Sequence, residues 1–181
     1  MHPASYEFMK YFVEKYLDKQ KKTSIIDIGS MNINGIYRPI FENNDNWEYV
    51  GMDIQSGPNV DIVGFENIKD KYDVLISGQV MEHVKRPWEW LPSLKKYIKQ
   101  NGLICIIVPH TLDEHKYPID TYRYFPDGMI DLFEFSNINI LEIKKNYADT
   151  MGIGKIVEVN KIKNNIKNNK IIYRYQGMET I

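Results

Sequence analysis

Apolar and polar positions follow one another along this chain in patterns that separate short buried strands from amphipathic helices. Residues 6–17 place apolar side chains at helical spacing, with lysines and acids between them, and so predict a helix. Short β-branched or apolar runs predict strands at residues 23–28, 47–54, 60–63, 72–77 and 103–108. The last of these runs is the most apolar stretch, which favours a central place in a parallel sheet.

Helices are expected between these strands. The pattern predicts them at residues 37–42, 87–100 and 129–135. The second helix is entered through Pro87 and closed by Asn101 and Gly102, the usual asymmetry of helix ends. Pro92 inside this window leaves open a helix start near that residue.

The C-terminal part is predicted to close the sheet. Residues 138–144 and 155–159 are expected to form two further strands. The Lys/Asn-rich segment 160–181 either forms a last strand near residues 171–175 or stays a polar tail. The 181 residues fit one domain. Within this single domain, 1–181, we expect an N-terminal helical segment, 1–22, and a substrate loop, 109–128.

Strands that alternate with helical segments predict an α/β fold with a parallel sheet built from βαβ units. In such sheets, ligands bind beyond the carboxyl ends of the strands, near the point where the strand order reverses. The motifs of this chain that carry chemistry all follow predicted strands. We therefore expect a single site at that edge of the sheet.

Composition and charge narrow the partners. The hydrophobic fraction of 43% and the charged fraction of 26% are those of an ordinary globular protein. A formal net charge of -1 gives no electrostatic footprint for nucleic acid or an anionic membrane. The start has no signal-peptide pattern, no apolar run is long enough to span a bilayer, and Cys105 lies in a core strand. We expect a cytoplasmic protein, a monomer or homodimer, with neither nucleic acid nor membrane as partner.

The first strand leads into a candidate cofactor site. Asp27 and Gly29 end this strand, and Gly35 then permits a sharp turn before the next helix. Backbone groups at such a turn can hold a cofactor that carries a carboxylate and an ammonium group. A dinucleotide site would need three glycines in G-x-G-x-x-G spacing, which this loop lacks. Asp53 ends the second strand, where an acid either accepts hydrogen bonds from ribose hydroxyls or simply caps a turn.

Together these stretches resemble class I S-adenosylmethionine-dependent methyltransferases of the type 11-like kind, over about residues 25–133. The resemblance lies in residues 26–30, 49–53, 72–77 and 80–84. Family members usually have Gly-x-Gly where this chain has Gly29, Ser30 and Met31. The resemblance implies a Rossmann-like, doubly wound, mostly parallel seven-stranded sheet with helices on both faces. It also implies S-adenosylmethionine as the cofactor, with S-adenosylhomocysteine as the product.

The same resemblance assigns parts of the cofactor to residues. It implies that Gly29, Ser30 and Met31 contact the methionine part, while Asp53 holds the ribose. Ile54 would flank the adenine, and Gln79 would lie beside the sulfonium. The candidate cofactor-binding residues are Asp27, Gly29, Ser30, Met31, Gly35, Asp53, Ile54 and Gln79.

The segment 109–128 carries the candidate acceptor chemistry. It is too long for an ordinary connection and leaves the carboxyl end of the fifth strand. We expect catalytic roles for His115, Asp120 and Tyr122, and substrate contacts from His110, Tyr117 and Arg123. Alternatives stay open: Arg123 pairs with Asp120 or Asp127, and the aromatic residues serve as lid packing. For His83, next to Glu82, a structural role at the helix entrance is favoured.

This loop resembles a subgroup of small bacterial methyltransferases of surface-polysaccharide or secondary-metabolite pathways. The resembling pattern is His-x-Tyr-Pro-x-Asp-x-Tyr-Arg-x-x-Pro-Asp-Gly, here residues 115–128. We predict O-methylation of a small polar or anionic acceptor, such as a sugar, phosphate-bearing or phosphoramidate capsule intermediate. No metal is expected, because no compact His/Asp/Glu ligand spacing is present. The alternatives are N- or nucleic-acid methylation, a non-catalytic cofactor-binding protein and, least favoured, an NAD-dependent oxidoreductase.

Overall fold

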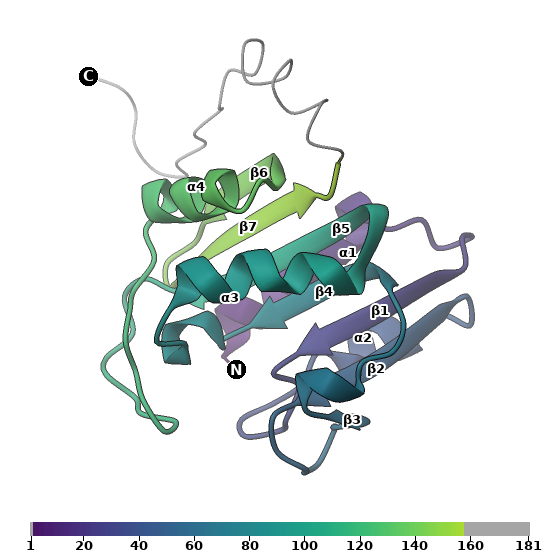
Figure 1. Ribbon diagram of the computed structural model, residues 1–181, viewed down its shortest axis with the longest axis horizontal. Coiled ribbons are helices and arrows are strands. Elements are labelled where there is room, and N and C mark those ends of the chain that lie inside the picture. Colours follow the sequence, from purple (N-terminus) through teal and green to yellow (C-terminus); the bar gives the residue numbers. More distant parts are fainter. Residues whose placement is uncertain (1, 158–181) are drawn as a thin grey trace.

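A computed structural model describes residues 2–157 of the chain as one seven-stranded sheet between two layers of helices (Figure 1). The strand order is β3-β2-β1-β4-β5-β7-β6. The first five strands pair in parallel, and β7 runs antiparallel between β5 and β6. The strands are β1 Thr23–Ile28, β2 Trp47–Asp53, β3 Ile62–Val63, β4 Tyr72–Gly78, β5 Ile98–Pro109, β6 Asn139–Lys145 and β7 Asp149–Lys155. The order reverses between β1 and β4, so the doubly wound, mostly parallel sheet is confirmed.

Helices cover both faces of this sheet. In Figure 1, α3 and α4 lie in front of the strands, whereas α1 and α2 lie behind them. Leu91 and Phe133 of the front helices pack with Leu75 in one core cluster, and Phe12 and Phe41 of the rear helices belong to a second. The helices are α1 Pro3–Tyr16, α2 Arg38–Glu42, α3 Pro87–Leu94 and α4 Pro126–Phe135, with 3₁₀ turns η1 Phe65–Asn67, η2 Met81–His83 and η3 Lys95–Tyr97. Two cores, one on each side of a buried sheet, follow from strands that are apolar on both faces.

The predicted helix 87–100 is wrong at its C-terminal end. Helix α3 starts at Pro87, contains Pro92 and ends at Leu94. Strand β5 already begins at Ile98, which pairs with Tyr72 of β4 and is buried. The apolar side chain of Ile98 is therefore buried as part of strand β5 and not on the face of a helix. The suggested helix start near Pro92 is also wrong.

The predicted closing strand 155–159 is wrong as well. Strand β7 occupies Asp149–Lys155, and the residues from 158 onward lie outside the described part. The expected last strand at residues 171–175 lies outside it too. Strand β7 contains glycines, so its sequence lacks the apolar pattern that predicts a strand. The glycines are needed for space: a Cβ on Gly152 would lie 2.7 Å from the Phe133 ring, and one on Gly154 would lie 2.3 Å from Ile138. Close packing against α4, which only small residues permit, explains why this strand is rich in glycine and not in bulky apolar residues.

The parallel order brings the carboxyl ends of β1, β2, β4 and β5 to one edge of the sheet. The loops after these strands and the N-terminal residue His2 lie around a common cavity at this edge. Among the described residues, none of the helices combines the length and the apolar character that a membrane span requires. The functional site is therefore sought at the carboxyl edge, as expected for a doubly wound sheet.

Candidate active site

The cavity has a volume of about 690 Å³. Its walls come from the loops after β1, β2 and β4 on one side and from residues 112–118, after β5, on the other. Six of the eight predicted cofactor residues line it: Gly29, Met31, Gly35, Asp53, Ile54 and Gln79. Of the predicted acceptor residues, His115 and Tyr117 line it. The fold thus joins residues from both halves of the predicted site.

The glycine loop is fixed by its backbone. Gly29 has a φ of 81°, a left-handed conformation that disfavours other residues. A Cβ at this position would lie only 2.2 Å from Cγ2 of Val80, in the loop after β4. The backbone N–H of Gly29 donates to the carbonyl of Met52 at 2.8 Å. The loops after three strands therefore meet at Gly29, and a side chain there would separate them.

Asp53 stands where a ribose-binding acid is expected. Its Oδ2 accepts the backbone N–H of Met31 at 3.2 Å, and its Oδ1 accepts that of Gln55 at 3.3 Å. Ile54, the next residue, is 66% exposed and lines the same cavity. Each carboxylate oxygen can accept a further hydrogen bond, so the acid and the apolar side chain form a polar and an apolar wall side by side.

Asp27 and Ser30 do not line the cavity, and their predicted contact with the cofactor stays a prediction. Asp27 is buried beneath the loop, where it accepts the hydroxyl of Tyr49. Burial raises the pKa of Asp27 to about 7. Ser30 donates to the carbonyl of Asn59 at 3.0 Å, and the Asn59 amide donates back to the Ser30 carbonyl at 2.7 Å. The hydrogen bonds of both residues stabilise the conformation of the loop after β1.

Gln79 leads to two residues that sequence analysis missed. It has a left-handed φ of 60°, and its amide donates to Oδ1 of Asp149 at 3.1 Å. Nε2 of His2, at the cavity wall, lies 3.1 Å from the same oxygen. Burial raises the pKa of the fully buried Asp149. Asp149 reaches this edge through the antiparallel pairing of β7 with β5, opposite Pro109, so no local motif marks it.

Arg123 and Asp120 pair with each other instead of facing the cavity. The guanidinium of Arg123 donates Nη1 and Nη2 to the two Asp120 oxygens at 2.6 Å each. It also donates to the carbonyls of Leu112 at 2.7 Å and Asp113 at 2.8 Å. Neither residue lines the cavity, and the predicted substrate contact of Arg123 and catalytic role of Asp120 stay predictions. Of the alternatives left open, pairing with Asp120 is the one observed.

This pair holds His115 in place. Asp120 accepts the backbone N–H of His115 at 2.7 Å. The Arg123 guanidinium holds the pKa of the Asp120 carboxyl well below its usual range, so the carboxylate stays charged. Arg123 joins the two ends of the segment 112–123 through its hydrogen bonds to the carbonyls of Leu112 and Asp113, and its bidentate pair with Asp120 fixes the guanidinium.

His110 and Tyr122 also lie outside the cavity lining. His110 is buried, with Nε2 3.0 Å from the carbonyl of Asn146. Tyr122 packs edge-on against Trp88 at a ring-centroid distance of 6.2 Å and tilted against Tyr124 at 6.1 Å. The predicted substrate contact of His110 and catalytic role of Tyr122 stay predictions, and the aromatic contacts of Tyr122 are compatible with the lid-packing alternative.

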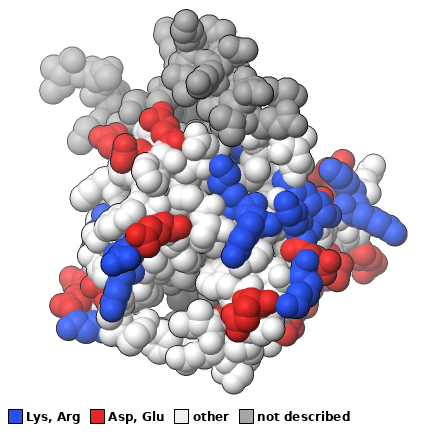
Figure 2. Space-filling view, viewed as in Figure 1, with Lys and Arg blue, Asp and Glu red and all other residues white. Residues whose placement is uncertain are grey.

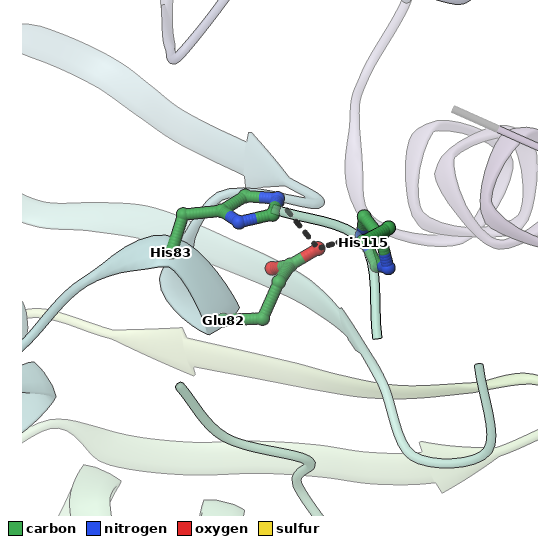
Figure 3. A group of neighbouring side chains, drawn as sticks. All are labelled: Glu82, His83 and His115. Atoms are coloured by element: carbon green, nitrogen blue, oxygen red, sulfur yellow. Dashed lines mark ion pairs between the residues drawn. The ribbon is translucent and has the colours of Figure 1, made fainter. Parts of the chain in front are cut away.

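Three side chains converge at the acceptor side, as Figure 3 shows. Nε2 of His83 lies 3.8 Å from Oε1 of Glu82, and Nε2 of His115 lies 3.9 Å from the same oxygen. The two imidazole rings stand nearly perpendicular, at 86° and a centroid distance of 5.1 Å. Glu82 and His83 belong to η2, after β4, whereas His115 comes from the loop after β5. Sequence analysis favoured a structural role for His83, but its side chain lines the cavity.

The protonation of this cluster follows from its contacts. Nδ1 of His83 lies 2.6 Å from the carbonyl of Ile119, and Nδ1 of His115 lies 2.9 Å from that of Asp113. A carbonyl only accepts, so each Nδ1 carries a proton, and Nε2 is the atom of each ring that faces the cluster. Burial raises the pKa of Glu82 to about 8. The cluster therefore presents two imidazole nitrogens beside a buried carboxyl group.

Comparison with known families identifies the chain. A family profile described as a methyltransferase domain matches residues 4–141. Because this match covers more than half of the sequence, the chain belongs to that methyltransferase family. No curated protein sequence matches the chain.

Solved structures share its fold at low sequence identity. The 1,6-didemethyltoxoflavin-N1-methyltransferase of Burkholderia thailandensis, with bound S-adenosylhomocysteine, has a TM-score of 0.68 at 9% identity, over 86% of this chain and 79% of that one. The magnesium protoporphyrin IX methyltransferase of Synechocystis PCC 6803, with bound SAM, has a TM-score of 0.59 at 11% identity, over 84% and 78%. A SAM-dependent methyltransferase of Aquifex aeolicus has 0.59 at 15% identity, over 87% and 100%. The predicted Rossmann-like methyltransferase fold is thus confirmed.

Proposed function

We propose that this chain transfers a methyl group from S-adenosylmethionine to a hydroxyl oxygen of a small polar or anionic acceptor. The observation that carries the proposal is the shared cavity. One group of lining residues, here called the cofactor wall, consists of Gly29, Asp53 and Gln79 at the ends of β1, β2 and β4. A second group, here called the acceptor wall, consists of His83 in η2 and His115 in the loop after β5. A donor and an acceptor bound against these two groups would share one cavity.

The cofactor fits the first wall by its chemistry. Asp53 offers oxygens to two ribose hydroxyls, and the exposed Ile54 side chain offers an apolar surface to the adenine. The buried Asp149 behind Gln79 and His2 supplies negative charge at the end where an ammonium group would lie. The Synechocystis and Burkholderia structures contain the cofactor or its demethylated product, which supports the same cofactor here.

The second wall favours a hydroxyl acceptor. A hydroxyl is a weak nucleophile at neutral pH, and a nearby base increases its reactivity. His83 and His115 line the cavity, and an imidazole is a side chain suited to act as such a base. In the transfer, an oxygen–methyl bond forms as the sulfur–methyl bond breaks. The hydroxyl proton passes to an imidazole, and the neutral thioether S-adenosylhomocysteine leaves.

The charge distribution is compatible with a small acceptor. On the face shown in Figure 2, Lys and Arg side chains gather on the right-hand half, and Asp and Glu side chains lie directly beside them. Among the described residues of this face both signs are therefore present, which is compatible with a small polar or anionic acceptor. Methylation of surface-polysaccharide intermediates in the cytoplasm, by a monomer or homodimer, stays a prediction. N-methylation stays an alternative, since the toxoflavin enzyme named above is an N1-methyltransferase.

Isothermal titration of S-adenosylmethionine and S-adenosylhomocysteine into the purified protein tests the cofactor half of the proposal. We expect both to bind with micromolar Kd, and then a labelled methyl donor to label hydroxyl-bearing sugars or sugar phosphates. Absence of binding by both molecules would favour a non-catalytic protein of the same fold. Label on an amine acceptor in place of a hydroxyl would move the assignment to N-methylation.

A further inference from the structure

We propose that Glu82, His83 and His115 form a binding site for one divalent transition-metal ion, with zinc as the first candidate. One ligand atom from each residue lies within 4.8 Å of the others. The two nitrogen–oxygen separations, 3.8 and 3.9 Å, are close to the roughly 3.3–3.6 Å that ligand bonds of about 2.0–2.2 Å give in a tetrahedral site. Small rotations of exposed or half-buried imidazoles are enough to close the difference.

The histidines are already oriented as metal ligands. In metal sites, the imidazole nitrogen that does not bind the ion almost always donates to a carbonyl or carboxylate, which fixes the tautomer. Here Nδ1 of His83 contacts the Ile119 carbonyl, and Nδ1 of His115 contacts the Asp113 carbonyl. Both Nε2 atoms are thereby left as the ligand atoms, and both face the same carboxylate oxygen (Figure 3). Two independent backbone contacts thus produce one convergent pair of nitrogen ligands.

Glu82 supplies the strongest sign that a cation belongs here. Its side chain is fully buried, and among the described residues neither carboxylate oxygen has a hydrogen-bond partner. A buried carboxylate without partners is costly, and such groups are normally paired or coordinate a metal. A metal ion between Oε1 and the two imidazoles would satisfy this oxygen. The Asp120–Arg123 pair stabilises the arrangement, because Asp120 holds the backbone of His115.

The donor set indicates the class of ion. Two imidazoles and one carboxylate suit zinc, iron, cobalt or nickel, whereas magnesium and calcium prefer oxygen ligands throughout. Three protein ligands leave at least one coordination position open, and both histidines line the cavity. We infer that an acceptor oxygen would occupy this position, and this role rests on the proposed function. With the ion bound, both Nε2 atoms would be ligands and not bases, so the metal would replace the imidazole base: it would make the bound hydroxyl lose its proton to water more readily, which suits transfer of a methyl group to oxygen.

Metal binding can be measured without any methyl acceptor. Protein freed of metal by a chelator would be titrated with zinc chloride by calorimetry, and with cobalt(II) by absorption spectroscopy. We expect one equivalent to bind. The variants Glu82→Gln, His83→Ala and His115→Ala should each weaken binding by about tenfold or more, since even second-shell changes cost 10–100-fold. Matched controls are Glu114→Gln, an exposed carboxylate on the same loop, and His110→Gln, a histidine outside the cluster.

Thermal unfolding gives a second test. Saturating zinc should raise the Tm of the wild-type protein and leave that of Glu82→Gln unchanged. Without metal, Glu82→Gln should be at least as stable as the wild type, because it removes a buried carboxylate that has no partner. Absence of saturable binding, or binding that survives all three substitutions, overturns the metal site. If zinc does not bind but S-adenosylmethionine does, the metal site is wrong and the proposed function is unaffected. If zinc binds but S-adenosylmethionine does not, the proposed function is wrong and the metal site is unaffected.

Discussion

The two walls of the cavity are built in different ways. The cofactor wall consists of short loops that directly follow β1, β2 and β4, and parallel pairing brings these strand ends together. The acceptor wall combines His83 of η2 with a long segment after β5, whose two ends are joined by hydrogen bonds from Arg123 to the carbonyls of Leu112 and Asp113. Residues on the cofactor wall are fixed by the sheet itself. Residues on the acceptor wall are fixed by side-chain contacts that span many residues of loop.

This difference separates binding from turnover. Changes on the cofactor wall should alter affinity for S-adenosylmethionine, since the strand ends exist without the loop. Changes on the acceptor wall should alter turnover while the cofactor still binds. The four substitutions below test that division, from the largest expected effect to the smallest.

His115→Ala should have the largest effect. We expect kcat to fall by about 10²–10⁴-fold, the usual contribution of a general base, with an unchanged Kd for S-adenosylmethionine. Labelled methyl transfer and calorimetry would measure the two quantities. Glu114→Gln, on the same loop but exposed and paired with Lys116, is the control and should retain wild-type turnover. An equal loss of cofactor affinity in His115→Ala would contradict the division between the walls.

Asp53→Ala should show the opposite pattern. We expect cofactor binding to weaken by about 1–3 kcal/mol, the typical cost of leaving buried polar partners unpaired. Calorimetry would measure this loss, and Asp45→Ala, an exposed aspartate before β2, should bind normally. If Asp53→Ala bound the cofactor as the wild type does, the ribose assignment would be wrong.

Arg123→Lys tests whether the charged pair positions the acceptor wall. Lysine cannot donate to two carboxylate oxygens and two carbonyls at once, so the segment 112–123 should loosen. We expect kcat to fall by roughly 10- to 100-fold, because small misplacements of catalytic groups are costly. Hydrogen exchange should become faster in this segment. Arg86→Lys, an exposed arginine beside Glu89, is the control, and unchanged exchange in Arg123→Lys would refute the positioning role.

Gly29→Ala tests the backbone of the cofactor wall. The left-handed φ alone costs about 1–2 kcal/mol for a residue with a Cβ, and Val80 lies in the way of that atom. Urea unfolding should show this loss of stability. Gly128→Ala provides a control of opposite sign, since its Cβ meets no atom within 4 Å and alanine in a helix is favoured by about 0.5–1 kcal/mol. Equal stability of the two variants would show that Gly29 tolerates a side chain.

Much of the fold could be predicted because the signals are local. Strand β1 was predicted at its observed limits, and β2 and β4 within one residue, because each is a compact apolar run before an acid, glycine or serine. The errors came where neighbours override the local pattern. Ile98 joined β5 because it pairs with Tyr72, and β7 is built on glycines that make room for α4.

The candidate site divides in the same way. Gly29, Asp53 and Gln79 were found because their positions at strand ends are visible along the chain. Asp27 and Ser30 lie in the same motif, but their side chains point into packing contacts that only the folded loop reveals. Sequence spacing likewise offered no compact set of metal ligands, although Glu82 and His83 are adjacent to each other.

By itself, the sequence determined the order of the strands and helices, the glycine and acid of the cofactor wall, and membership of the methyltransferase family. The physical reason is that strand periodicity, turn conformation and strand-end acids depend on residues close together in the chain. Tertiary structure alone decided that Arg123 binds Asp120 and that His115 meets Glu82 and His83. Glu82 and His115 are more than thirty residues apart in the chain, and their contact forms only once β4 and β5 lie side by side. Arg123 and Asp120 are close in sequence, but the sequence left open whether Arg123 pairs with Asp120 or Asp127.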